Sequence, residues 1–263
     1  LPVLVGVAAA QPVVVRRQLV HERGNAQAFF VFDTSRSMLA SADPGLPNRL
    51  ARSKQLARKL RAALGNVPVG IASMTDRTLP DLMPTTDPAL FTRTLVQSVG
   101  YDEPPPSQPY GRGRATAFAA LVPLVTSHFY SPESTHRLLV VFTDGEAQPG
   151  TELLGLGIQH KIAPVFVHVW AAGERIYGRG GRPDPFYTTD PRSILDLDAA
   201  ARVTGGSVYD EHQLGRIEAQ ARKIVGNGPT TAQISAYARV PLGRWFALGG
   251  ILPLAFLLWR RNL

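Results

Sequence analysis

Two largely apolar runs in the middle of the chain, each followed at once by an aspartate, constrain the fold more than any other feature. Residues 28–32 (AFFVF) precede Asp33, and residues 137–143 (RLLVVFT) precede Asp144. Strands buried on both faces have such continuous apolar sequences, and they occur in parallel sheets covered by helices. We therefore expect both runs to be central strands of an α/β domain, each with a carboxylate at its C-terminal end.

Helical patterns alternate with further apolar runs between residues 16 and 226, which indicates βα units around a mostly parallel sheet. Predicted helices cover residues 48–64, 116–124, 192–202 and 213–225, with another beginning at Asp87; further predicted strands cover residues 69–74, 78–83, 163–170 and 207–209. Asn48 and Asp87 have side chains suited to capping a helix N-terminus. We expect a doubly wound α/β fold with helices on both faces of the sheet.

The first predicted helix carries its basic residues on the side away from its apolar stripe. These residues are Arg52, Arg58, Lys59 and Arg61, and they are expected to lie mainly outward in solvent.

Length and composition restrict the class of protein. A chain of 263 residues can hold one α/β domain of about 200 residues plus appendages. The absence of cysteine excludes disulfides, thiolate catalysis and cysteine-based zinc sites. The net charge is +8, but the arginines are spread along the chain without a dense block. Nucleic-acid binding is therefore not expected, because it needs many basic residues gathered on one face.

The N-terminal segment, residues 1–15, carries no charge. It is interpreted either as the end of a transmembrane helix or as a signal-peptide remnant with an Ala-x-Ala cleavage signal at residues 8–10. A buried first strand over residues 12–15 is the alternative. The sequence leaves these three interpretations open.

The C-terminal segment contains a second uncharged run, residues 245–259. At 1.5 Å per residue it spans about 22 Å, less than the ~30 Å core of a bilayer, so a span has to include Arg244. We predict a transmembrane helix over residues 244–261, joined to the domain by a juxtamembrane linker over residues 227–243. A buried C-terminal helix is the alternative.

This prediction implies a cell-membrane protein with one or more spans. Arg260 and Arg261 favour a cytoplasmic C-terminus and an extracytoplasmic domain.

Oxygen-bearing side chains follow the two central strands and one loop. Asp33, Ser35 and Ser37 come directly after the first strand, Asp144 follows the second, and Thr116 lies at a predicted loop-to-helix transition. Ligands of open α/β sheets bind at the carboxyl ends of the strands. An all-oxygen set suits a hard cation such as Mg²⁺, which rarely has a complete protein shell. We predict a metal site with one position open to a partner's carboxylate. Alternatively, the two aspartates only cap their own loops.

The pattern Asp33-x-Ser35-x-Ser37, then Thr116, then Asp144 resembles the metal-ion-dependent adhesion site of von Willebrand factor A (vWA) domains. The resemblance covers roughly residues 27–225. It implies that Ser35 and Ser37 contact the metal directly and that Thr116 does so directly or through water. Asp33 and Asp144 would act mainly through water.

More narrowly, the chain resembles bacterial membrane-anchored vWA proteins of the aerotolerance-operon type. The features that carry this resemblance are the Gln-Pro ending of the N-terminal lead-in, the DTSRSM motif, the helix opening at residues 47–50 and the apolar C-terminus. The resemblance implies MoxR-type AAA+ ATPases and other vWA membrane proteins as partners. Two departures are Arg36, where many members have glycine, and Arg114-Ala115 before Thr116.

We therefore predict a binding module rather than an enzyme. Its cation is Mg²⁺, or Mn²⁺ or Ca²⁺, and its ligand is an Asp or Glu of a protein partner. The alternatives are a metal-assisted hydrolase, for which Glu146 is the only nearby base, and a stand-alone surface adhesin. Walker A, GxSxG and HExxH motifs are absent from the sequence. His160 and His168 lack metal-ligand spacing and are expected to be structural, and Glu146 is expected to be solvated.

Overall fold

The computed structural model describes residues 9–10, 13–107, 116–127, 129–148, 162–178 and 180–261. The chain divides into two compact units. One is Glu22–Thr231, and the other combines Leu1–His21 with Ala232–Leu263. The two units are described separately below.

The larger unit is built on a six-stranded sheet with the strand order β4-β3-β2-β6-β8-β9. The strands are β2 (Ala26–Asp33), β3 (Val69–Met74), β4 (Thr78–Thr85), β6 (His136–Thr143), β8 (Val165–His168) and β9 (Ser207–Asp210). All neighbours pair in parallel except β3 and β4, which are antiparallel. The predicted mostly parallel sheet, with an edge strand near residue 78, is confirmed.

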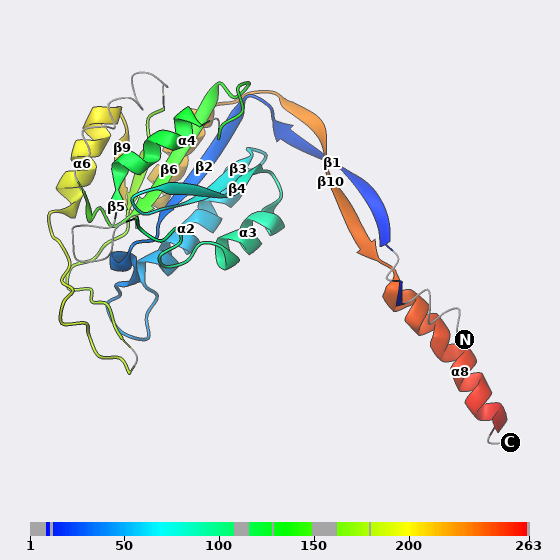
Figure 1. Cartoon of the computed structure of the whole chain (residues 1–263). Coiled ribbons are helices and arrows are strands. Elements are labelled where there is room, and N and C mark those ends of the chain that lie inside the picture. Colours follow the sequence, from blue (N-terminus) through cyan, green and yellow to red (C-terminus); the bar gives the residue numbers. More distant parts are fainter. Residues whose placement is uncertain are drawn as a thin grey trace. The chain divides into compact units, whose positions relative to one another are not determined.

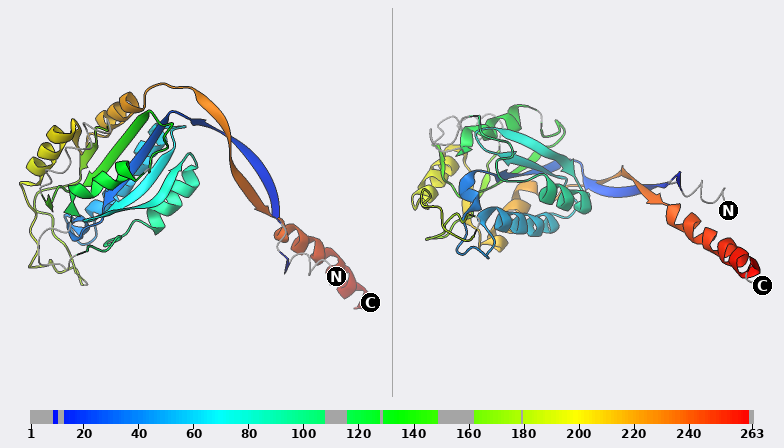
Figure 2. Two further views of the ribbon diagram at one scale, coloured as in Figure 1. Left: turned by 45° about the horizontal axis from the view of Figure 1, so that its top comes forward. Right: turned by 60° about the horizontal axis from the view of Figure 1, so that its bottom comes forward.

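Helices cover both faces of this sheet (Figures 1 and 2). They are α2 (Arg49–Ala63), α3 (Pro88–Gln97), α4 (Val122–Thr126), α6 (Ser193–Thr204) and α7 (Leu214–Val225), with the 3-10 turns η1 (Arg36–Leu39) and η2 (Phe118–Leu121). Side chains alternate along β2, so that Phe30 and Phe32 pack with α2, α3 and α7. Phe29 and Val31 pack with η2, α4 and α6. This two-sided burial explains why β2 is apolar throughout.

The predicted N-caps of two helices are confirmed. The side chain of Asn48 accepts a hydrogen bond from Ala51 N at 2.8 Å at the start of α2. Asp87 accepts from Ala89 N at 2.8 Å and from Leu90 N at 3.1 Å at the start of α3. Both caps satisfy backbone N–H groups that have no partner within the helix.

The predicted helix over residues 116–124 is wrong at its start. Residues Thr116–Ala117 form the short strand β5, which pairs in parallel with β7 (Ala147–Gln148), and α4 begins only at Val122. The backbone N–H of Ala117 donates to the carbonyl oxygen of Thr75 at 3.2 Å. This bond to the chain after β3 holds the segment extended, which helical spacing alone does not reveal.

The predicted basic face of α2 is also partly wrong. Arg61 is buried, and its guanidinium donates to the carbonyl oxygens of Gly65 at 2.8 Å and Thr86 at 2.7 Å. Arg52 pairs with Glu211 at 2.8 Å. All three acceptors lie outside α2, so the periodicity of the helix gives no sign of them.

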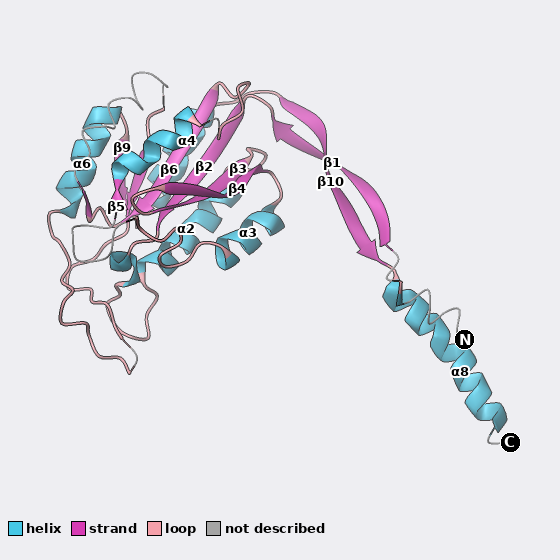
Figure 3. Ribbon diagram, in the orientation of Figure 1, coloured by secondary structure: helices cyan, strands magenta, loops and turns pink. Residues whose placement is uncertain are grey.

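The smaller unit contains a two-stranded sheet and a helix, drawn by type in Figure 3. Strand β1 (Val13–Arg23) pairs with β10 (Thr230–Pro241), so most of the predicted linker over residues 227–243 forms a strand. The alternation of apolar and polar residues along β10 was the missed signal. Val13 and Val14 are exposed, which contradicts a buried strand there. The interpretations of residues 1–8 lie outside the described residues.

The C-terminal segment forms the helix α8 (Gly243–Arg261). Within the described part of the chain, none of the helices is both long and apolar enough to traverse a bilayer. The predicted transmembrane helix over residues 244–261 is corrected accordingly. Arginines at 244, 260 and 261 confine the uncharged run to about 22 Å.

Asp81 on β4 generates a prediction about stability. Burial raises the pKa of Asp81 to about 6, although Ser73 Oγ donates to its carboxylate at 2.6 Å. The unfolded value is near 3.9, so ionisation destabilises the fold as the pH rises through 6. Asp81→Asn keeps an acceptor and removes the charge. We expect a higher Tm than wild type at pH 8 and the same Tm at pH 3.5, measured by circular dichroism. A Tm difference independent of pH would contradict this account.

Candidate metal site

The candidate site lies where the winding of the sheet reverses. Strands β2 and β6 are parallel neighbours, but the chain continues from β2 to β3 on one side and from β6 to β8 on the other. Such a reversal opens a crevice at the carboxyl ends of the two strands. Asp33 is the last residue of β2, and Asp144 follows the last residue of β6. Both predicted carboxylates therefore lie at the edge that the sequence indicated.

Asp33 is the centre of a buried hydrogen-bonded group. Its Oδ1 accepts from Ser35 N and from Thr116 Oγ1, each at 3.0 Å, and its Oδ2 accepts from Thr143 Oγ1 at 2.7 Å. The hydroxyl oxygens of Ser35 and Ser37 lie 3.0 Å apart. Four of the five predicted ligands are thus linked through hydrogen bonds. Thr143 was not predicted, although it directly precedes Asp144.

Asp144 is held on the other side of the site. Its Oδ1 accepts from Glu146 N at 3.0 Å. Gly145 has a φ of +75°, and a Cβ at this position would lie 2.6 Å from the carbonyl oxygen of Ser193. Only glycine fits both the left-handed backbone and this close approach. The loop that carries Asp144 is therefore pressed against the start of α6.

The charge on Asp33 tests whether these residues fit a cation. Burial and the nearby charge of Asp144 raise the pKa of Asp33 to about 6, against the lowering effect of the hydrogen bonds from Ser35 and Thr143. The donors described for Asp33 are all uncharged. A divalent cation would supply the positive charge that these donors lack, and hydroxyl and carboxylate oxygens are the ligands hard cations prefer. The residues therefore fit a hard divalent ion.

The donor set depends on hydroxyl groups. In the described parts of the chain, no three His, Asp or Glu side chains gather in an arrangement that could hold a metal ion. The candidate site differs from that type because three of its five side chains, Ser35, Ser37 and Thr116, carry hydroxyl groups.

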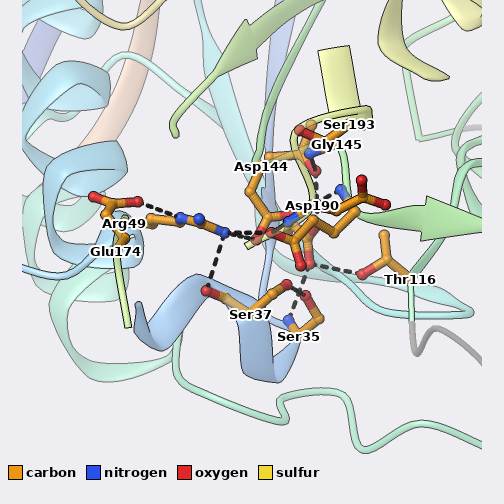
Figure 4. Close-up of polar contacts among 12 residues, drawn as sticks. Ser35, Ser37, Arg49, Thr116, Asp144, Gly145, Glu174, Asp190 and Ser193 are labelled. Atoms are coloured by element: carbon orange, nitrogen blue, oxygen red, sulfur yellow. Dashed lines mark hydrogen bonds and ion pairs between the residues drawn. The ribbon is translucent and has the colours of Figure 1, made fainter. Parts of the chain in front are cut away.

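A buried arginine at the first position of α2 borders the site, and we did not predict its role (Figure 4). Arg49 is fully buried, and its Nη1 donates to Asp144 Oδ2 at 2.8 Å. The same nitrogen donates to Glu146 Oε1 and to Tyr187 Oη, each at 3.0 Å, while Nε donates to Glu174 Oε2 at 2.6 Å. Arg49 thus joins carboxylates from the Asp144 loop and from the segment between β8 and α6, residues 171–190.

The protonation of Arg49 follows from these partners. Burial alone would lower its pKa, but the charge of Asp144 together with Tyr187, Glu174 and Glu146 outweighs burial and raises it. A permanent positive charge therefore faces one side of Asp144. The local sequence gives no sign of this role, because Asp144 lies 95 residues and Glu174 125 residues further along the chain.

The prediction that Glu146 is solvated is wrong. Its Oε1 accepts from Arg49, from Tyr187 Oη at 2.9 Å and from Asp190 N at 3.2 Å. Burial, and then the charge of Asp144, raise the pKa of Glu146. Glu146 therefore connects the start of α2, through Arg49, with the segment that carries Tyr187 and Asp190.

His168 has a structural position, as predicted. Its Nε2 lies 3.0 Å from the carbonyl oxygen of Asp144 and 3.1 Å from Ser193 Oγ. Burial lowers its pKa, which favours the neutral ring. His168 thus contacts both the Asp144 loop and the start of α6. His160 lies outside the described residues.

The sequence departs from the vWA pattern at Arg36 and at residues 114–115, and the structure describes only the first of these. Arg36 forms an ion pair with Asp184 and is 42% exposed, so its side chain extends to the 171–190 segment. Residues 114 and 115 lie outside the described part of the chain.

Comparison with protein-family models gives no match, and neither does comparison with curated protein sequences. Solved structures do match. An aerotolerance-related membrane protein from Bacteroides fragilis is 20% identical, with a TM-score of 0.57, over 76% of this chain and 98% of that one. The conserved hypothetical protein BatB from Bacteroides thetaiotaomicron is 20% identical, with a TM-score of 0.59 and the same coverage. Together with the serine and aspartate motifs on this sheet, these similarities identify the fold of the chain as vWA-like.

Proposed function

We propose that this chain is a vWA-type binding module that holds one divalent cation and, through it, an acidic group of a protein partner. Asp33, Ser35, Ser37, Thr116 and Asp144 are the proposed ligands. The cation is Mg²⁺ in this proposal, with Mn²⁺ and Ca²⁺ as alternatives. When bound, the cation would offer an open coordination position to a carboxylate. The observation that carries the proposal is the buried Asp33, surrounded by hydroxyl groups and uncharged donors.

The chain's own residues prepare this site in distinct ways. Thr116 and Thr143 fix both carboxylate oxygens of Asp33. Glu146 N and Arg49 fix those of Asp144. Because the side chains are already oriented, little conformational entropy is lost when an ion binds.

A binding role is favoured over hydrolysis. A metal-assisted hydrolase needs a base free to accept a proton from water. Glu146, the nearby candidate, already accepts three hydrogen bonds at its Oε1. These bonds hold Glu146 between Arg49 and Tyr187, which supports a structural part for it in the proposed module.

The proposed setting is a membrane-associated assembly with a MoxR-type AAA+ ATPase and other vWA membrane proteins, on the extracytoplasmic side. One structural neighbour is named an aerotolerance-related membrane protein, which supports membrane association. The helix α8 has apolar side chains that are more than half exposed and suited to contact with lipid. They are Trp245, Leu248, Ile251, Phe256, Leu257, Leu258 and Trp259.

Metal binding is tested through stability. Mg²⁺ at about one hundred times its Kd should stabilise the fold by about 2.7 kcal/mol, because the ion binds only the native state. Asp33→Asn and Ser35→Ala should abolish this gain, measured by thermal unfolding and calorimetry.

Asp43→Asn removes an exposed carboxylate from the following loop and should respond to Mg²⁺ like wild type. Equal Mg²⁺ stabilisation of wild type and Asp33→Asn would reject the site.

Membrane association is tested with vesicles of phosphatidylglycerol and phosphatidylcholine. Changing Trp245 and Trp259 of α8 to serine should lower the fraction of full-length protein that co-sediments, because two exposed rings are lost. Phe186→Ser removes an exposed ring from the other unit and should sediment like wild type. Unchanged sedimentation of the double variant would argue against a role for α8.

The assembly is tested by co-purification in detergent from the native cell. We expect the AAA+ ATPase with wild type in Mg²⁺, less of it after chelation, and little with Asp33→Ala. Recovery of equal amounts with the variant would mean that the ATPase contacts another surface.

A further inference from the structure

Helices α2 and α7 lie side by side and run in the same direction on one face of the sheet. In the first half of α2, Arg52 donates to Glu211, just before α7, at 2.8 Å. At the other end, Arg222 of α7 donates to the carbonyl oxygen of Ala63, the last residue of α2, at 3.4 Å. The buried residues of both helices belong to one apolar cluster. The two helices therefore present one continuous outer surface.

This outer surface is strongly basic. Its exposed arginines and lysines, which we call the basic surface, are Arg58, Lys59, Arg216, Arg222 and Lys223. Glu218, paired with Arg222 at 3.7 Å, is the one acidic residue in the sequences of α2 and α7. By contrast, α6 on the opposite face of the sheet carries Asp196 and Asp198 as well as Arg202. Among the helices, the positive charge is therefore gathered on one side of the sheet.

The cations of α2 already repel one another. Lys54 and Arg58 are one helical turn apart, a spacing at which like charges are unfavourable. Burial, and then the charge of Arg58, lower the pKa of Lys54. The basic surface takes no part in the proposed metal site, and an anionic ligand would relieve its repulsion.

We propose that the basic surface is a docking surface for a bilayer that contains anionic phospholipid. Helix α8 of the same chain has exposed apolar side chains suited to lipid and ends in the exposed Arg260 and Arg261. An apolar segment and a basic surface together bind an anionic bilayer more stably than either alone. This inference rests on the membrane association in the proposed function.

A bilayer fits the basic surface better than a nucleic acid or an acidic protein. Because α8 and the basic surface belong to one chain, attachment of α8 raises the concentration of lipid headgroups that the basic surface meets. A layer of phosphate groups also matches charges spread over two neighbouring helices. Each basic residue near an anionic bilayer strengthens binding by about fivefold, and salt screens this attraction.

The test titrates the full-length protein with vesicles of phosphatidylcholine alone and with vesicles that also contain phosphatidylglycerol, followed by sedimentation. Wild type should bind the anionic vesicles more tightly at low salt, and about 0.5 M NaCl should remove most of this preference. Arg58→Gln and Arg216→Gln together should weaken binding to anionic vesicles by about 25-fold. The same double variant should bind neutral vesicles like wild type.

A charge-matched control separates the basic surface from the net charge of the chain. Arg192→Gln and Arg202→Gln together remove two exposed arginines at the start and in the last turn of α6. This control should bind anionic vesicles like wild type, because it leaves the basic surface intact. Both double variants should keep the Tm of wild type and its response to Mg²⁺, since none of these side chains is a proposed ligand.

Three results would overturn the role of the basic surface. They are unchanged binding of the Arg58 and Arg216 variant to anionic vesicles, an equal loss in the α6 control, and an equal loss on neutral vesicles. Loss of a co-purifying protein with retained vesicle binding would assign the surface to an acidic partner instead. The proposed role of α8 fails separately, if changing Trp245 and Trp259 to serine leaves binding to neutral vesicles unaltered.

Discussion

The architecture of the site depends on the ion pairs that the guanidinium of Arg49 forms with buried carboxylates. The guanidinium lies inside the protein with carboxylates of Asp144, Glu146 and Glu174 around it. Removing the guanidinium would leave buried carboxylates without their cation, and breaking a buried ion pair costs about 3–5 kcal/mol. The three acidic residues come from two loops far apart in the chain, so one side chain holds both loops to the start of α2.

This arrangement separates two kinds of carboxylate at the same edge of the sheet. Asp144 faces a permanent positive charge, whereas the donors on Asp33 are hydroxyl and amide groups. The negative charge that lacks a positively charged partner is therefore that of Asp33, among the hydroxyl groups around it. A single cation at the proposed site would compensate this charge, and Arg49 could still donate to Asp144 Oδ2.

Much of the fold followed from the sequence because burial on both faces leaves a clear pattern. The apolar runs before Asp33 and Asp144 predicted two central strands, and parallel pairing then places both aspartates at one edge. The role of Arg49 did not follow, because periodicity tells which side of a helix is polar and not which distant carboxylates meet it. Strand β10 was missed although its residues alternate, because its partner β1 lies near the other end of the chain and local sequence does not reveal that pairing.

The close approach at Gly145 has a consequence for how the site keeps its dimensions. The carbonyl oxygen of Ser193 occupies the space that any side chain at 145 would need. Helix α6 packs on the sheet through Leu197 and Ala200, and its first residue limits how the Asp144 loop can move toward it. The position of Asp144 relative to Asp33 is therefore fixed by the packing of a helix on a sheet. Under the proposed function, the apolar core would in this way set the size of the ion that the site accepts.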